Sequence, residues 1–117
     1  MADRSTLFDD IDSMEPERFA QHLAPNAVMV FGNAEPINGR DAIRDAWGAF
    51  CADVDGVRHE LVDTFSKEDR TVVEARVTYT RKDNREVTVP VVTIYRAPGE
   101  LIDDYRIYID LAPLFAE

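Results

Sequence analysis

Apolar residues in the first half of the chain repeat with the period of an α-helix. The spacing within residues 7–11 predicts a short helix. A second helix is predicted to begin at Ser13, a residue type that caps helix starts, and to end before Pro25. The third and clearest helix is predicted over residues 41–51. Its apolar stripe consists of Ile43, Ala46, Trp47 and Phe50.

Beyond Gly56 the pattern changes to the alternation of β-strands. After a short early strand at residues 27–31, longer strands are predicted at residues 59–65, 71–81, 86–96 and 101–111. The turns between the last three are short, so neighbouring strands should run antiparallel. Helices followed by a strand meander predict an α+β fold, with a curved antiparallel sheet wrapped around three N-terminal helices.

Two of these strands separate polar from apolar side chains. Glu74, Arg76 and Thr78 share one face of their strand, and Tyr108 and Asp110 share the polar face of the last strand. These faces can point to water, or they can point into a pocket between the sheet and the helices. A carboxylate and an arginine inside an apolar pocket are costly unless they pair or serve a ligand. The second interpretation therefore makes Asp110 and Arg76 a candidate site.

The strand at residues 86–96 is apolar on both faces. Such a strand needs cover on both sides, and three helices can cover only one face of the sheet. The other face would expose a large apolar patch unless a partner chain packs on it. We therefore expect a homodimer that forms through the exposed sheet face.

Size and charge narrow the range of functions. A chain of 117 residues suits a single domain, residues 1–117. A net charge of −10 repels nucleic acid and anionic lipid, so neither nucleic acid nor a membrane is expected as a partner. The lone Cys51 and the absence of a signal-peptide pattern at Met1 to Arg4 favour a cytoplasmic protein. The sequence contains no metal cluster, phosphate loop or nucleophile motif, so no metal and no cofactor are expected.

Two stretches of the chain resemble a known superfamily. Residues 26–31, followed by Asn-Gly-Arg-Asp-Ala-Ile at residues 38–43, resemble the segment that leads into the third helix of nuclear transport factor 2-like proteins. Tyr-Arg-Ile-Tyr-Ile-Asp-Leu at residues 105–111 is similar to the closing strand of the SnoaL-like and limonene epoxide hydrolase-like branches. The resemblance covers nearly the whole chain and implies a cone with an internal pocket for an apolar small molecule. The residues that it places around this pocket are Phe8, Ile11, Met29, Phe31, Trp47, Phe50 and Thr78.

The resemblance also implies catalytic roles for particular residues, and at several of these positions the chain has a different residue type. The epoxide hydrolases use an Asp-Arg-Asp set in which the closing-strand Asp matches Asp110 and the Arg matches Arg76. The second Asp is replaced by Thr78, which cannot donate a proton as a carboxylic acid does. The two residues that hold the attacking water in those enzymes are matched here by Met29 and Phe31, which are apolar. The catalytic positions of ketosteroid isomerase are apolar in this chain as well.

Two main classes of function stay open, with two weaker alternatives. As an isomerase or cyclase, the protein would use Asp110 as a general base, Arg76 to orient it and Tyr108 as a hydrogen-bond donor. As a non-catalytic binding or assembly protein, it would keep Asp110 and Arg76 as a buried ion pair. Epoxide hydrolysis and a protein-binding adaptor role are weaker alternatives. SnoaL-like cyclases also use a histidine, for which the chain offers His22 and His59, although both are also explained as structural residues.

Overall fold

A computed structural model describes residues 6–116; residues 1–5, which include the segment without a signal-peptide pattern, and residue 117 lie outside the described part. The helices in the described part are α1 (Leu7–Asp12), α2 (Pro16–Ala20), α3 (Arg40–Ala52) and α4 (Ala112–Phe115). The strands are β1 (Leu23–Phe31), β2 (Ile37–Asn38), β3 (Gly56–Lys67), β4 (Arg70–Thr80), β5 (Glu86–Arg96) and β6 (Ile102–Ile109). None of these helices combines the length and apolar character needed to cross a membrane.

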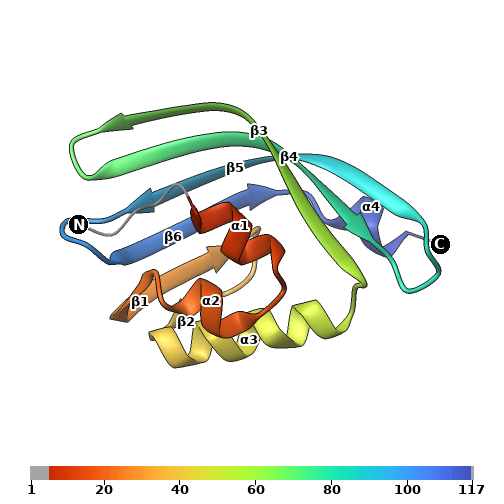
Figure 1. Cartoon of the computed structure of the whole chain (residues 1–117), viewed down its shortest axis with the longest axis horizontal. Coiled ribbons are helices and arrows are strands. Elements are labelled where there is room, and N and C mark those ends of the chain that lie inside the picture. Colours follow the sequence, from red (N-terminus) through yellow and green to blue (C-terminus); the bar gives the residue numbers. More distant parts are fainter. Residues whose placement is uncertain (1–5, 117) are drawn as a thin grey trace.

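The strands of the described part form one curved sheet that does not close, in the order β2-β1-β6-β5-β4-β3. Figure 1 shows β3 to β6 arching over α1 and α2, with α3 packed below β1. This confirms the predicted α+β cone. One pairing differs from the expected meander, because β1 runs parallel to β6 while the other neighbours are antiparallel.

Helix α3 closes one side of the cone because its apolar stripe faces the sheet. Ile43, Trp47 and Cys51 are buried at successive turns of the helix. The helix begins after Gly39, whose φ of 100° lies in the left-handed region that favours glycine. The backbone N–H of Gly39 also donates to the carbonyl of Ala27 at 2.7 Å, which fixes the start of α3 against β1.

The second helix is shorter than predicted. It ends at Ala20, and β1 begins at Leu23, within the span expected to be helical. The backbone N–H of Ile102 donates to the carbonyl of His22 at 2.8 Å, so pairing with the last strand begins there. Ser13 does not cap α2. Its hydroxyl donates to the carbonyl of Asp10, and α2 starts after Glu15.

The end of the chain also differs from the prediction. Strand β6 stops at Ile109, and residues 112–115 form α4 instead of continuing the sheet. The Asp110 carboxylate accepts the backbone N–H of Ala112 at 2.9 Å, and Pro113 stands in the first turn, where its missing N–H costs no helical bond.

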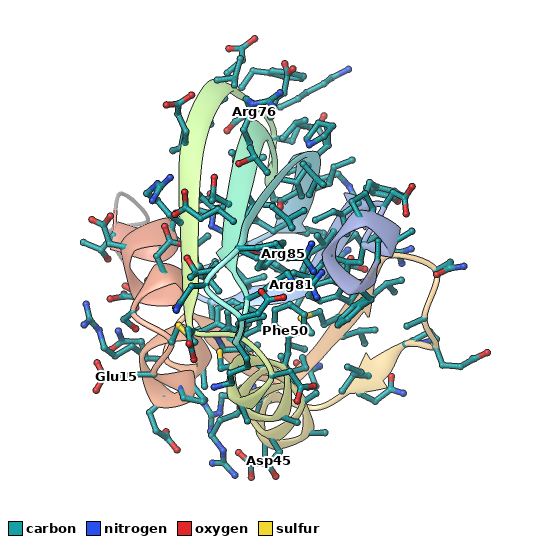
Figure 2. All side chains as sticks on the ribbon, turned by 90° about the vertical axis from the view of Figure 1, so that its right-hand side faces the viewer. Glu15, Asp45, Phe50, Arg76, Arg81 and Arg85 are labelled. Atoms are coloured by element: carbon teal, nitrogen blue, oxygen red, sulfur yellow. The ribbon has the colours of Figure 1, made fainter. Side chains whose placement is uncertain are left out.

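The polar faces of β4 and β6 point away from the helices. Glu74 and Arg76 are exposed, and Arg76 lies far from α3 at the top of Figure 2. The intervening residues belong to the core. They are Val73, Ala75, Val77 and Tyr79. The first interpretation of the sequence pattern therefore holds, because charged side chains stay hydrated while the alternating apolar ones are buried.

Candidate functional site

Two cavities lie between the sheet and the helices. The outer cavity has a volume of about 810 Å³ and opens near α4. Its lining includes Met29, Phe31, Trp47, Phe50 and Phe115, and is mostly apolar. The inner cavity has a volume of about 30 Å³ and lies deeper in the cone. The outer cavity matches the size of ordinary small-molecule sites, whereas the inner one has room for a single water-sized group.

The inner cavity contains a histidine that is held by a carboxylate. His59, in β3, lines this cavity, and its Nδ1 lies 2.6 Å from Oδ1 of Asp12, at the end of α1. The other oxygen of Asp12 accepts the backbone N–H of His59 at 2.8 Å. The ring of Phe8 packs against the imidazole at a centroid distance of 5.0 Å. Three contacts therefore fix the orientation of His59.

This arrangement determines what His59 can do. When the ring is neutral, the nitrogen that faces a carboxylate carries the proton, so Nε2 presents its lone pair. Nε2 has no hydrogen-bond partner within residues 6–116. The side chain is only 10% exposed, and its neighbours in the inner cavity are largely apolar. An oriented imidazole nitrogen of this kind can accept a proton from a bound molecule and return it.

Two tyrosines share the inner cavity with His59. Tyr79 and Tyr105 are 3% and 2% exposed. Burial raises the pKa of both phenols, and the charge of Asp12 raises the pKa of Tyr79 further. A hydrogen bond with Thr93 partly opposes the rise in the pKa of Tyr105. Both hydroxyls therefore keep their protons at neutral pH and can act as hydrogen-bond donors.

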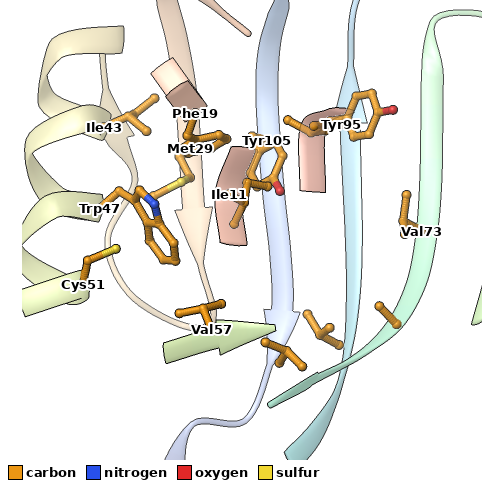
Figure 3. Packing of buried hydrophobic residues seen from close by; sticks show 14 of the residues in the cluster. Ile11, Phe19, Met29, Ile43, Trp47, Cys51, Val57, Val73, Tyr95 and Tyr105 are labelled. Carbon is orange, nitrogen blue, oxygen red and sulfur yellow. The ribbon is translucent and has the colours of Figure 1, made fainter. Parts of the chain in front are cut away.

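Trp47 stands between the two cavities and contributes to the wall of both. It is 6% exposed and stacks on Phe50 with a centroid distance of 5.4 Å and an interplanar angle of 14°. Within residues 6–116, its indole nitrogen is the one buried side-chain nitrogen or oxygen without a hydrogen-bond partner. Figure 3 shows this nitrogen facing the side chain of Met29.

The predicted catalytic residues lie at or beyond the rim of the outer cavity. Asp110 and Tyr108 line its mouth, but both side chains are exposed. Arg76 lies on the helix-free face and lines neither cavity. Strand register places Arg76 opposite Pro90, and Val91 opposite Ile109, so β5 separates Arg76 from Asp110. No ion pair between these two residues forms in the described part of the chain, and the catalytic roles of all three stay predictions.

Most of the predicted pocket residues are on the cavity walls, although their contact with a ligand stays a prediction. Met29, Phe31 and Trp47 line both cavities, Phe50 lines the outer one and Ile11 the inner one. Phe8 reaches the site indirectly, through its contact with His59. Thr78 is an exception. It lies on the helix-free face, where its hydroxyl is 2.8 Å from that of Thr88, because Val77 and Tyr79 on either side of it occupy the core face.

A second histidine–carboxylate contact lies outside the cavities. Asp10 and His22 are 5% and 6% exposed, and His22 Nε2 lies 2.7 Å from Oδ2 of Asp10. Arg18 and Gln21 donate to the same carboxylate. Both carboxylate oxygens of Asp10 are occupied by hydrogen bonds with His22, Arg18 and Gln21. The Asp10–His22 pair therefore has a structural role, because it joins α1, α2 and the start of β1.

Asp12 has no local sequence pattern that marks it as a functional residue. It lies in an acidic run at the end of α1 that is typical of solvated residues, and its partner is 47 positions away. Cys51 behaves as a buried apolar residue, since burial raises the pKa of its thiol to about 11. Among residues 6–116, no group of three or more His, Cys, Asp or Glu side chains could hold a metal ion.

Comparison with known proteins agrees with this architecture. A family model described as a SnoaL-like domain matches residues 5–105. A protein of ketosteroid isomerase-like fold from Catenulispora acidiphila, in complex with trimethylamine, superimposes with a TM-score of 0.86 at 19% identity, covering 93% of this chain and 85% of that one. A Jannaschia protein described as a SnoaL-like polyketide cyclase gives a TM-score of 0.82 at 16% identity, with 94% and 84% covered.

An LEH-like epoxide hydrolase from M. tuberculosis is also similar, with a TM-score of 0.80 at 13% identity and 95% and 82% of the chains covered. These identities show a shared fold and no more. No curated protein matches the chain by sequence.

Proposed function

The chain belongs to the SnoaL-like domain family, and from this premise we propose that it binds an apolar small molecule in the outer cavity and moves a proton within it, as an isomerase or cyclase does. The observation that carries the proposal is the contact between Asp12 and His59, which engages Nδ1 and, within residues 6–116, leaves Nε2 as the unoccupied nitrogen of an imidazole that lines the inner cavity. General acid–base catalysis of this kind typically contributes about 10²- to 10⁴-fold to a rate.

In this proposal the outer cavity binds the ligand and the inner cavity is where the proton is transferred. The outer cavity has the volume and the apolar lining to hold the body of the molecule. Its reacting end would reach His59 past Met29, Phe31 and Trp47, which line both cavities. Met29 is the most adaptable of the three, because its unbranched side chain has three rotatable bonds. Tyr79 and Tyr105 supply donors that can stabilise negative charge as it develops.

Asp110 is the second candidate for the base, as the resemblance of residues 105–111 to the closing strand of the epoxide hydrolase-like branch implies. It lies at the mouth of the outer cavity, where water reaches it. One of its oxygens already accepts the N–H of Ala112. The exposed Asp110 carboxylate is hydrated and already holds Ala112, whereas proton transfer needs an oriented group within reach of a bound molecule, so Asp110 suits binding at the entrance better.

A base-sensitive probe tests this assignment without knowledge of the natural substrate. 5-Nitrobenzisoxazole is flat and apolar. Removal of its ring C–H proton by a base breaks the N–O bond and gives a coloured cyanophenolate. We expect the protein to accelerate this reaction and His59→Gln to lower the rate by about 10²-fold or more. His22→Gln is the matched control, since it also removes an imidazole next to an aspartate but lies outside the cavities.

The outcomes are distinct. If Asp110→Asn abolishes the reaction and His59→Gln does not, the carboxylate at the mouth is the base and the assignment to His59 is wrong. If the wild-type protein binds the probe but gives no acceleration, a non-catalytic binding protein replaces the enzyme. Epoxide hydrolysis is a weaker candidate, because Met29 and Phe31 provide no polar atom to hold an attacking water at the positions that the resemblance points to.

We also propose that two copies of the chain associate through the helix-free face of the sheet. Val92 and Ile94 of β5 are half-buried there, and Phe65 and Tyr108 on the same face are 59% and 54% exposed. Charges of both signs border this apolar strip, including Glu74 and Arg76. A twofold axis would bring the strip onto itself and place opposite charges within reach of each other.

A further inference from the structure

The indole N–H of Trp47 is a buried donor that nothing in residues 6–116 accepts. A buried donor without a partner costs about 1–3 kcal/mol, and native proteins rarely retain one without a reason. Trp47 sits at the partition between the outer and inner cavities, because it lines both. We propose that this N–H recognises a hydrogen-bond acceptor on the ligand, so that Trp47 selects flat ring compounds that carry a carbonyl oxygen over the corresponding hydrocarbons.

The shape of the wall supports a flat ring as the body of the ligand. Trp47 and Phe50 stack nearly parallel, and Phe31 packs on Phe50 at a centroid distance of 5.5 Å. Ala46, one turn before Phe50 on α3, also lines the outer cavity and adds little bulk there. An aromatic surface of this kind favours stacking or edge contacts with another ring.

The small size of the inner cavity supports a single oxygen as the recognised group. While Met29 keeps its position, a volume of about 30 Å³ admits one water-sized group and no ring. The oxygen of a carbonyl would fit there while the ring stays in the outer cavity. In Figure 3 the indole nitrogen faces Met29, which also lines both cavities, so displacement of the flexible Met29 side chain opens the donor to the ligand.

This inference rests on the ligand-binding part of the proposed function, but not on its proton transfer. It assigns Trp47 to specificity, and it requires only that the indole N–H meets an acceptor. His59 can therefore fail as a base while Trp47 still discriminates between ligands, and the converse also holds.

The chain contains one tryptophan, which gives a direct spectroscopic test. 1-Tetralone and tetralin share a fused ring skeleton and differ by the carbonyl oxygen. In ¹⁵N-labelled wild-type protein there is a single indole N–H resonance to follow. We expect 1-tetralone to move this resonance downfield, as formation of a hydrogen bond does, and tetralin to leave the proton shift largely unchanged. Equal shifts with both compounds would overturn the proposal.

Binding to a variant provides the second measurement. Trp47→Phe keeps an aromatic ring and removes the N–H, so 1-tetralone should bind about tenfold more weakly while tetralin binds as before. Phe50→Leu is the matched control, because it should weaken both compounds to a similar extent through lost ring contacts. His59→Gln should leave the indole shift intact, which separates failure of this proposal from failure of the proposed reaction.

Discussion

The carboxylate of Asp12 holds both the side chain and the backbone of His59, with bonds of 2.6 and 2.8 Å to Nδ1 and to the amide nitrogen. This contact joins α1 to β3 across 47 positions of the chain. Asp12→Ala removes both acceptors, so we expect a loss of about 1.5–3 kcal/mol in the free energy of unfolding, measured in urea. Asp9→Ala, on the exposed side of the same helix, should change stability by less than about 0.5 kcal/mol.

Asp10 makes stability depend on pH in a predictable direction. The hydrogen bond with His22, and then that with Arg18, holds the pKa of the Asp10 carboxyl below its ordinary value of 3.8, while burial opposes the shift. At a pH between the folded-state pKa of Asp10 and its ordinary pKa in the unfolded chain, the unfolded chain binds more protons than the folded one. The free energy of unfolding therefore rises with pH in this interval. The contribution is complete above the ordinary pKa and is lost as pH falls through that of the folded state.

Asp10→Asn should therefore flatten the dependence of the unfolding free energy on pH in the acidic range below about pH 4. At neutral pH the variant should be less stable by about 1.5–3 kcal/mol, because hydrogen bonds to a charged group are lost. Thermal denaturation over a pH series measures both effects. An unchanged slope in the acidic range would show that Asp10 does not carry this dependence.

Arg81 holds α4 in place next to the outer cavity through hydrogen bonds. Its guanidinium donates to the carbonyls of Leu114 and Ala116, and Figure 2 shows it near the centre of the end-on view that displays α4. Arg81→Ala should loosen α4, so the amide of Leu114 should exchange with solvent about tenfold faster in hydrogen–deuterium exchange. Arg85→Ala is the control, since Arg85 pairs with Asp83 in an exposed turn. Equal protection in both variants would contradict this role.

The proposed dimer depends on the apolar strip of the helix-free face. Phe65→Asp places a charge within the apolar strip, so we expect a dimeric wild-type protein and a monomeric variant by light scattering. Phe115→Asp adds the same charge at an equally exposed aromatic residue on α4, and should remain dimeric. A wild-type protein that is monomeric at high concentration would rule the dimer out.

Local patterns were enough to predict the elements that are governed by burial on one face. The stripe of α3 and the alternation in β4 and β6 follow from the need to bury apolar side chains, and the structure has these elements within a few residues of the predicted bounds. The short length of α2 and the parallel pairing of β1 could not be read in the same way. Both involve contacts with β6, which is distant in sequence, such as the bond from the Ile102 N–H to the His22 carbonyl.

The candidate site was harder to predict because polar alternation does not tell which face is inside. Polar alternation at residues 71–81 and 101–111 predicts a site at Asp110 and Arg76, but the fold places Asp110 at the rim of the outer cavity and Arg76 on the helix-free face. His59 is one of two histidines with no distinguishing pattern around it, and Asp12 lies in an acidic run typical of solvated residues. Their meeting requires the tertiary contact of α1 with β3, for which neither residue carries a local pattern. For α4, the sequence Asp-Leu-Ala-Pro at residues 110–113 is typical of a helix start, with an aspartate before the helix and a proline in its first turn.

The parallel pairing of β1 with β6 has a consequence for how the chain reaches its fold. As the chain emerges from the ribosome, β1 is complete long before its partner, and only the two-residue β2 is at hand to pair with it. The central ladder of the sheet can form only when β6 has been synthesised. Until then the apolar residues of β1, Ala27 and Met29 among them, have no finished sheet to join. Nascent chains stalled before residue 102 should therefore be protease-sensitive in their N-terminal half, and dependent on chaperones in a way that the completed chain is not.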